Sequence, residues 1–128
     1  MVITSVARRR MLFLHGMFVP PSVYQDKIAA PLLSCFEDHG WECVFLKSPR
    51  PNSGQVFEVV KQLFPELTEH PEWMNSRNDD SVDGATKVFD GLQDSLQVLQ
   101  DYLNENPKFD VIAGHSQGAL MESILSLL

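Results

Sequence analysis

The stretch that decides the fold expected of this chain is Phe109-Asp110-Val111-Ile112-Ala113-Gly114-His115-Ser116-Gln117-Gly118-Ala119-Leu120. It contains the pattern G-x-S-x-G, with Gly114, Ser116 and Gly118 at the fixed positions. The apolar run Val111 to Ala113 suits a buried parallel strand, and the apolar residues after Gln117 recur at helical spacing. A strand, a tight turn and a helix in this order predict a nucleophile elbow, in which the hydroxyl of Ser116 is exposed on a strained turn.

The geometry of the turn explains which residue types flank Ser116. Glycines are needed at 114 and 118 because the strand and the helix nearly touch at so tight a turn, which leaves no room for a Cβ. The N–H of Gln117 begins the helix and has no partner within it, so it can stabilise an oxyanion beside Ser116. The alternative is an ordinary glycine-bounded turn with a surface serine, but the five matched positions in this setting favour the elbow.

Two more apolar runs predict strands, Met11 to Leu14 and Trp41 to Leu46, and the first of them ends in the tight turn His15-Gly16. A helical segment is predicted from about Ser22, and Pro31 either kinks it or begins a second piece. The side of this helix expected to be buried carries Val23, Ile28, Ala29, Leu32, Leu33 and Phe36. The order strand, helix, strand predicts a parallel α/β sheet.

The pattern weakens in residues 52–83, which is longer than a minimal connection and is typical of a lid or binding loop. The alternative is an irregular surface insertion. Regular structure is expected to return at Asp90, a candidate N-cap with Gln93 three residues later. The apolar stripe of this predicted packing helix consists of Phe89, Leu92, Leu96, Leu99 and Leu103.

The composition suits one globular domain, residues 1–128, with 44% hydrophobic residues. The net charge is −7, and residues 51–128 hold thirteen acidic and four basic side chains, which argues against nucleic-acid binding. Cys35 and Cys43 are too few for a disulfide framework and no secretory signal precedes them, so we expect two buried free thiols in a cytoplasmic protein. Residues 1–10 contain three arginines and are interpreted as a lead-in to the first strand.

Nearly the whole chain resembles the FSH-type serine hydrolases of the α/β-hydrolase superfamily. The residues that carry the resemblance are Leu12 to Gly16, Ser48-Pro49, Trp73, Gly91-Leu92, Ser95-Leu96, Asp101-Tyr102, and Phe109-Asp110 with Gly114 to Ala119. The resemblance implies that Ser116 is the nucleophile and that the backbone N–H groups of Met17 and Gln117 form the oxyanion hole. It implies that His15 and Gly16 shape the loop carrying Met17, and that no cofactor or metal is needed.

Two departures from similar sequences lie beside this expected site. Phe18-Val19-Pro20-Pro21 is more apolar than is usual after His-Gly, and His115 stands where a Phe is commoner. Either change could alter the entrance to the acyl site.

The acid and base of the triad are missing from their expected place. In this fold they follow the nucleophile, in the order Ser, Asp or Glu, His, but the twelve residues after Ser116 contain no Asp and no His. His15, His39 and His115 are assigned other positions, and His70 would have to fold over the site to act as base. We therefore expect a truncated α/β-hydrolase domain that is nearly inactive alone.

Three functions remain open. The first is a serine esterase or thioesterase that acts on small or medium acyl esters through an acyl-enzyme. The second is a non-catalytic interaction module that uses an exposed sheet edge, and the third is a short-acyl transferase, distinguished by whether water or an alcohol receives the acyl group. None of the three involves nucleic acid or a membrane.

The expected architecture is a three-layer α/β/α fold with helices on both faces of a three-stranded parallel sheet. Strand-helix-strand crossovers are right-handed, and the resemblance implies that the first strand lies between the other two. The expected order is therefore Trp41 to Leu46, Met11 to Leu14, Phe109 to Ala113. Because the last strand is then a sheet edge, we expect a homodimer or a missing C-terminal portion to cover residues 109–128.

Overall fold

The computed structural model describes residues 8–52, 55–79 and 86–128. The elements follow in the order β1 (Arg9–Leu14), α1 (Pro21–Val23), the π-helical turn η1 (Tyr24–Ile28), α2 (Ala30–Asp38), β2 (Trp41–Leu46), α3 (Glu58–Leu63), β3 (Asn75–Asn78), β4 (Lys87–Asp90), α4 (Leu92–Glu105), β5 (Val111–Gly114) and α5 (Gln117–Leu125). Residues 1–7 of the predicted lead-in, and residues 53–54 and 80–83 of the predicted excursion, lie outside the described ranges.

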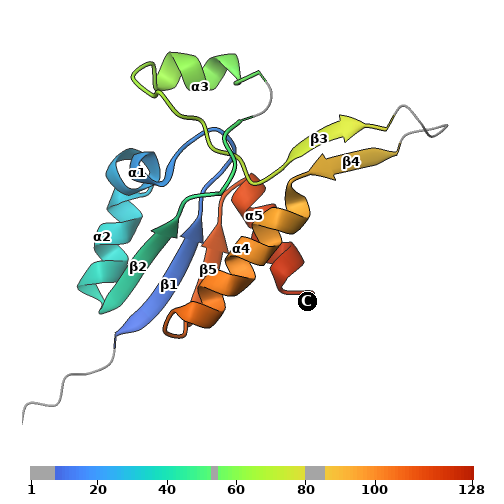
Figure 1. Cartoon of the computed structure of the whole chain (residues 1–128). Coiled ribbons are helices and arrows are strands. Elements are labelled where there is room, and N and C mark those ends of the chain that lie inside the picture. Colours follow the sequence, from blue (N-terminus) through green and yellow to red (C-terminus); the bar gives the residue numbers. More distant parts are fainter. Residues whose placement is uncertain (1–7, 53–54, 80–85) are drawn as a thin grey trace, which may run out of the picture.

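The main sheet is parallel, with the strand order β2-β1-β5 (Figure 1). Met11 on β1 lies opposite Cys43 on one side and Val111 on the other. This confirms the predicted order and places the carboxyl ends of β1 and β5 side by side. The bounds differ at the strand starts: β1 begins at Arg9 rather than at Met11, and β5 begins at Val111 rather than at Phe109.

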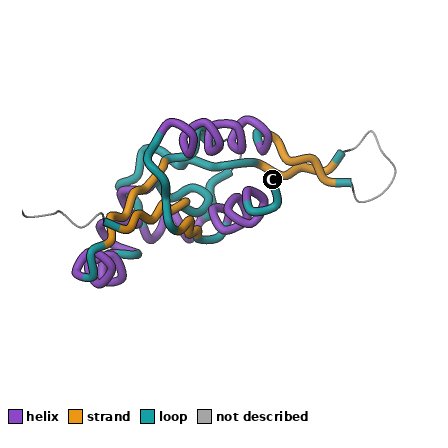
Figure 2. The backbone as a smooth tube through the Cα atoms, turned by 90° about the horizontal axis from the view of Figure 1, so that it is seen from below, coloured by secondary structure: helices purple, strands orange, loops and turns teal. Residues whose placement is uncertain are grey.

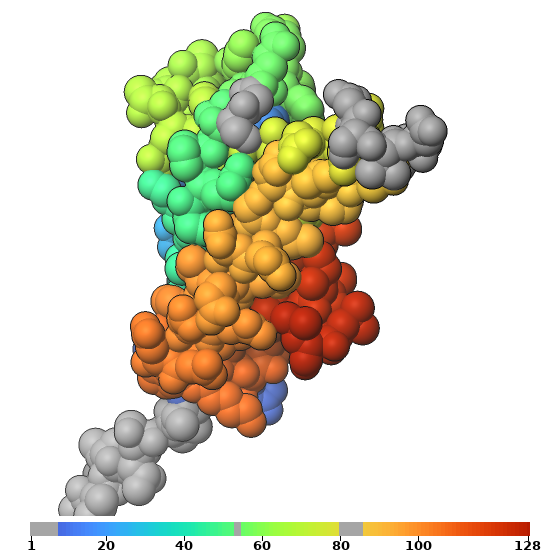
Figure 3. All heavy atoms as spheres, turned by 45° about the vertical axis from the view of Figure 1, so that its right-hand side comes forward, coloured from blue at the N-terminus to red at the C-terminus, as the bar shows by residue number. Residues whose placement is uncertain are grey.

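Alternating residues of β1 supply the two cores, because successive side chains of a strand point to opposite faces. Leu12 and Leu14 are fully buried on one face, in a cluster with Leu99 of α4 and Met121 of α5. Phe13 packs on the other face, against the cluster formed by Phe18, Val19, Val23, Tyr24 and Val60. The sheet therefore has helical residues on both faces, as expected, and α4 and α5 lie side by side (Figure 3).

The segment predicted to be helical from Ser22 forms three pieces. The π-helical turn η1 follows α1, and α2 begins at Ala30 with Pro31 in its first turn, so of the two alternatives for Pro31 the structure shows the start of a second piece. The predicted buried side is wrong in part, since Ile28 is 47% exposed and Leu32 is 59% exposed. The extra residue of a π-helical turn changes the phase of the residues that follow it, so one continuous helical stripe cannot describe this segment.

The excursion is more regular than its sequence pattern indicated. It contains the short helix α3, and β3 pairs with β4 in an antiparallel hairpin that projects away from the main sheet (Figures 1 and 2). Asp90 is therefore the last residue of β4 and not an N-cap, and Phe89 is an exposed strand residue. Gly91 occupies the N-cap of α4 with a φ of 84°, which a residue without a Cβ adopts at low cost.

The rest of the α4 stripe is confirmed. Leu99 is fully buried, and Leu92, Leu96 and Leu103 pack partly buried against the same core. The stripe packs against residues of β1 and α5, which is why the apolar residues of α4 recur at helical spacing. No side-chain hydrogen bond caps the start of this helix.

The two cysteines are free thiols, as predicted, but neither is buried: Cys35 is exposed on α2 and Cys43 is partly exposed on β2. No residue of α2 is fully buried, so this helix covers the sheet only loosely. No helix in the described ranges has the length and apolar character required to cross a membrane. No cluster of three or more His, Cys, Asp or Glu side chains in those ranges could hold a metal ion.

Candidate active site

Ser116 lies on the turn between β5 and α5, and its backbone is strained. Its φ is 55° and its ψ is −118°, a combination that side chains with a Cβ rarely adopt. The residue is exposed, whereas Gln117 and Gly118 directly after it are buried. The geometry is that of a nucleophile elbow: the turn puts the hydroxyl outside while the following helix packs inside.

The two glycines of the motif lie where backbone segments meet. A Cβ on Gly118 would collide with the carbonyl oxygens of Leu14 and His15, and a Cβ on Gly114 would collide with the backbone of Gly118 and Ala119. These contacts are with main-chain atoms, which cannot rotate away as a flexible side chain can. The close approach also places the start of α5 against the end of β1, where the predicted oxyanion turn begins.

Three successive amides of that turn have different partners. The N–H of Gly16 donates to the Tyr24 hydroxyl at 3.0 Å, and the N–H of Phe18 donates to the Pro71 carbonyl at 2.8 Å. Between them, the N–H of Met17 donates to no acceptor among the described residues, and neither does the N–H of Gln117. Phe18 follows with a φ of 69°, so this turn is strained as well.

His15 is a buried structural histidine that holds this turn. Its Nε2 accepts a hydrogen bond from the Ser48 N–H at 2.9 Å, so the ring proton is on Nδ1, which donates to the Gly16 carbonyl at 2.7 Å. Burial lowers the pKa of His15 to about 4, with a smaller contribution from the charge of Lys47, although the hydrogen bond to Gly16 acts in the opposite direction. Neutral His15 therefore links the carboxyl end of β1 to that of β2.

Gln117 has a second structural role that its place in the motif did not reveal. Its side-chain carbonyl accepts from the N–H of Trp73 at 2.6 Å and from the N–H of Met74 at 3.2 Å, and its amide donates to the Met74 carbonyl at 2.8 Å. The indole of Trp73 stacks on His15 and donates to its carbonyl at 2.8 Å. The excursion is thus fixed to both sides of the candidate site.

His115 forms a contact that sequence reasoning missed. Its Nδ1 lies 2.8 Å from the hydroxyl of Tyr24, the same hydroxyl that accepts from Gly16. Tyr24 is 2% exposed, whereas His115 is exposed. Burial raises the pKa of Tyr24, opposed by the hydrogen bond from Gly16, so the phenol stays protonated. The one sequence signal for this contact was the His at a position where similar sequences more often have Phe.

No histidine is hydrogen-bonded to Ser116 in the described part of the chain. His39 bonds the Cys35 carbonyl at the end of α2, and His70 bonds the Phe18 carbonyl at 3.1 Å. His15 and His115 have the contacts given above. The structure brings Ser116, Met17 and Gln117 to neighbouring strand ends, and no described residue provides a base hydrogen-bonded to the hydroxyl.

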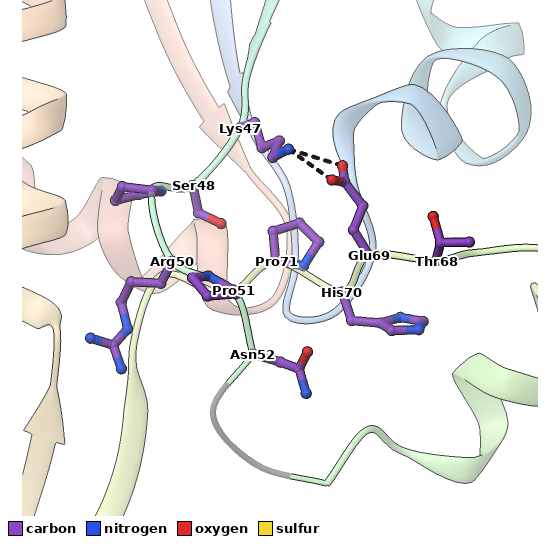
Figure 4. A pocket seen from close by; sticks show the side chains of 10 residues that line it. Lys47, Ser48, Arg50, Pro51, Asn52, Thr68, Glu69, His70 and Pro71 are labelled. Atoms are coloured by element: carbon purple, nitrogen blue, oxygen red, sulfur yellow. Dashed lines mark hydrogen bonds and ion pairs between the residues drawn. The ribbon is translucent and has the colours of Figure 1, made fainter.

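A cavity of about 330 Å³ lies at the carboxyl end of β2 (Figure 4). Two segments form its wall, residues 47–52 and 68–71. The Ser48 hydroxyl is buried with no hydrogen-bond partner among the described residues, and Figure 4 shows it on the cavity side of its segment. Because Pro71 accepts from the N–H of Phe18, the cavity adjoins the turn that carries Met17. It has room for a small ligand group beside that turn.

The parallel sheet, with a strained serine turn at the carboxyl end of β5, defines a protein of the α/β-hydrolase class. Within that class, the chain belongs to the FSH1 family of serine hydrolases, whose model matches residues 4–128 and is described as "Serine hydrolase (FSH1)". The comparison with curated proteins found no match.

Proposed function

We propose that this chain carries the nucleophile and oxyanion hole of a serine hydrolase that acts on small or medium acyl esters or thioesters. Ser116 attacks the carbonyl carbon, the alcohol or thiol leaves, and water then hydrolyses the acyl-enzyme. The observation that carries the proposal is the backbone of Ser116, whose strained φ and ψ place an exposed hydroxyl at the start of α5. Strain of this kind is retained mainly where function requires it.

The distribution of amide partners supports an oxyanion hole made by Met17 and Gln117. Both N–H groups lack an acceptor among the described residues, while the amides of Gly16 and Phe18 on either side of Met17 are occupied. Two unpaired donors at the ends of neighbouring strands suit the negative oxygen of a tetrahedral intermediate. In such a site one donor is worth roughly two to three orders of magnitude in rate.

The proposal includes a base that comes from outside the described residues. All four histidines have other hydrogen-bond partners, so Ser116 is not activated and its hydroxyl stays protonated at neutral pH. The 128-residue chain is therefore nearly inactive alone. A cytoplasmic location belongs to the same proposal and is supported by the two free thiols, Cys35 and Cys43.

The direct test is slow covalent labelling by a fluorophosphonate, with the modified residue identified by peptide mass. We expect the label on Ser116, none in Ser116→Ala, and unchanged labelling in the control Ser123→Ala, which removes an exposed hydroxyl of the same helix. Folding of Ser116→Ala should be unaffected because the hydroxyl contributes nothing to the core. A label on another residue in the wild type would overturn the assignment of the nucleophile.

A second candidate function, an interaction module, is favoured by the surface at β5. Within the described residues β5 pairs only with β1, and a groove of about 280 Å³ lies between α4, β5 and α5. Leu128 lines this groove and is exposed, and Val111 of β5, Leu120 of α5 and Leu127 are exposed elsewhere in residues 109–128. We propose that a second copy of the chain, or a C-terminal portion of a longer chain, covers residues 109–128, because open strand edges with apolar neighbours recruit partners.

A further inference from the structure

The Tyr24 hydroxyl joins the two halves of the candidate site. It lies 3.0 Å from the N–H of Gly16 on the oxyanion turn and 2.8 Å from Nδ1 of His115, which directly precedes Ser116. This side-chain bridge joins the two turns directly, beside the hydrogen bond from the His115 N–H to the Leu14 carbonyl, the close approach of Gly118 to the end of β1, and the indirect link through Trp73. It uses one buried oxygen.

The direction of each proton in this bridge follows from the donors available. An amide N–H can only donate, so the Tyr24 oxygen accepts from Gly16. The buried phenolic proton has no other acceptor among the described residues than Nδ1 of His115, so Tyr24 donates to that nitrogen and the ring proton of neutral His115 is on Nε2. The bridge therefore specifies one tautomer of the histidine beside the nucleophile.

The surroundings leave the bridge little freedom. A Cβ on Gly16 would lie 2.6 Å from the Tyr24 oxygen and 3.3 Å from Nδ1 of His115, so only a glycine fits below the hydroxyl. The Tyr24 ring packs against Phe13, with 5.3 Å between ring centroids. Tyr24 is also the first residue of η1, and π-helical turns are frequent at functional sites.

We infer that Tyr24 is a positioning residue that sets the oxyanion turn against the nucleophile elbow, an inference that rests on the proposed function. By accepting from the N–H of Gly16, Tyr24 fixes the His15–Gly16 peptide, which adjoins the Gly16–Met17 peptide whose N–H is the available donor. His115 is the partner that makes the bridge possible, because a Phe at this position would offer no acceptor. Tyr24 itself does not touch the reacting atoms.

The test compares Tyr24→Phe with Tyr102→Phe, a matched control whose hydroxyl has no hydrogen bond to a described residue. Nitrogen NMR of the histidine rings, at a pH where they are neutral, reports the tautomer of His115. We expect an unprotonated Nδ1 in the wild type and in Tyr102→Phe, and a mixture of tautomers in Tyr24→Phe. Fluorophosphonate labelling of Ser116 should be roughly tenfold slower in Tyr24→Phe alone, as the loss of one buried hydrogen bond at the site would cause.

The two readouts separate this inference from the proposed function. If Ser116 stays unlabelled in every variant even when imidazole is added in place of the missing base, the proposed function fails, and the NMR result alone decides whether the bridge exists. Labelling of Tyr24→Phe at the wild-type rate would overturn the positioning role, and so would a wild-type His115 with its proton on Nδ1. A thermal melt of each variant confirms that it is folded before the rates are compared.

Discussion

The side chain of Gln117 holds the backbone of Trp73, with 2.6 Å between the Gln117 carbonyl oxygen and the Trp73 nitrogen. The residue after the candidate nucleophile thus has two separate tasks. Its N–H points out of the helix start, while its buried amide replaces the hydrogen bonds that the excursion would otherwise make with water.

Gln117→Ala should destabilise the fold strongly. It leaves the N–H groups of Trp73 and Met74 and the Met74 carbonyl without their partner in a buried place, at a cost of about 3 kcal/mol or more. The control Gln97→Ala removes an exposed bond to Asp101 and should cost less than about 0.5 kcal/mol. Urea unfolding measures both, and equal effects would show that Gln117 does not anchor the excursion.

His15 should make stability depend on pH in a defined window. Its pKa is lowered from 6.5 to about 4 in the folded chain, so between these values the unfolded chain binds more protons and the free energy of unfolding rises with pH. The stabilisation is complete above 6.5 and is lost as pH falls toward 4, with a total of about 3 kcal/mol. Urea unfolding at several pH values should show this slope in wild type and in His39→Gln, but not in His15→Gln.

Gly118→Ala should be far more damaging than Gly40→Ala. The new Cβ at 118 meets the carbonyl oxygens of Leu14 and His15, so β1 or α5 has to shift, at a cost of at least about 3 kcal/mol. A Cβ added at Gly40 would have no atom within 4 Å apart from the adjacent residues of the chain. Only the φ of 83° opposes a side chain there, at a cost of about 1 kcal/mol. Thermal unfolding compares the two. A mild effect at 118 would mean that the elbow is less closely packed than the structure shows.

Free imidazole should accelerate the labelling of Ser116. If the chain has the nucleophile and the oxyanion donors but no base, an added base of the same chemistry restores part of the missing step. The rate should rise with imidazole concentration and follow its unprotonated form. Ser116→Ala, treated in parallel, should remain unlabelled. A fast reaction without imidazole would instead point to a base within the chain, and His70→Gln would be the first variant to examine.

Association through the β5 edge should be visible in sedimentation at micromolar concentration. We expect a dimer that Val111→Lys with Leu127→Lys converts to a monomer, because both side chains are exposed beside the edge and the charges oppose pairing. Ile112 is a poor choice for this test since it packs against the core. Val98→Lys adds one positive charge at an exposed position on α4 and should leave the dimer intact. A wild-type chain that sediments as a monomer, with no second fragment detected by mass spectrometry, would contradict the proposal.

The elbow could be predicted because its signal is local: the motif from Gly114 to Gly118 specifies a tight turn between a strand and a helix. The strand order followed from the right-handed crossover rule together with the family resemblance, which implies that Met11 to Leu14 lies between the other two strands. The β3–β4 hairpin could not be predicted in this way. Its first strand, Asn75–Asn78, is polar and mostly exposed. Because neither face of this strand is buried, its sequence has no alternation of apolar and polar residues that would indicate a strand.

The contacts that hold the site were beyond sequence reasoning for a different reason. Gln117 and Trp73 are 44 residues apart, and Tyr24 and His115 are 91 apart. A polar side chain does not indicate which distant backbone it will satisfy. His115 was noticed as a departure from similar sequences, but its partner could be identified only when the fold placed Tyr24 beneath it.

The π-helical turn between α1 and α2 allows the residues before it and after it to face different parts of the molecule. Tyr24 must face Gly16 and His115, whereas α2 must cover β2, and Ala29 closes the wide turn by donating to the Tyr24 carbonyl. Deleting one residue from 25–28 would restore a regular helix and turn the downstream residues by more than a quarter of a revolution relative to Tyr24. The length of this segment is therefore as much a part of the site as any side chain, and it would tolerate substitutions far better than insertions or deletions.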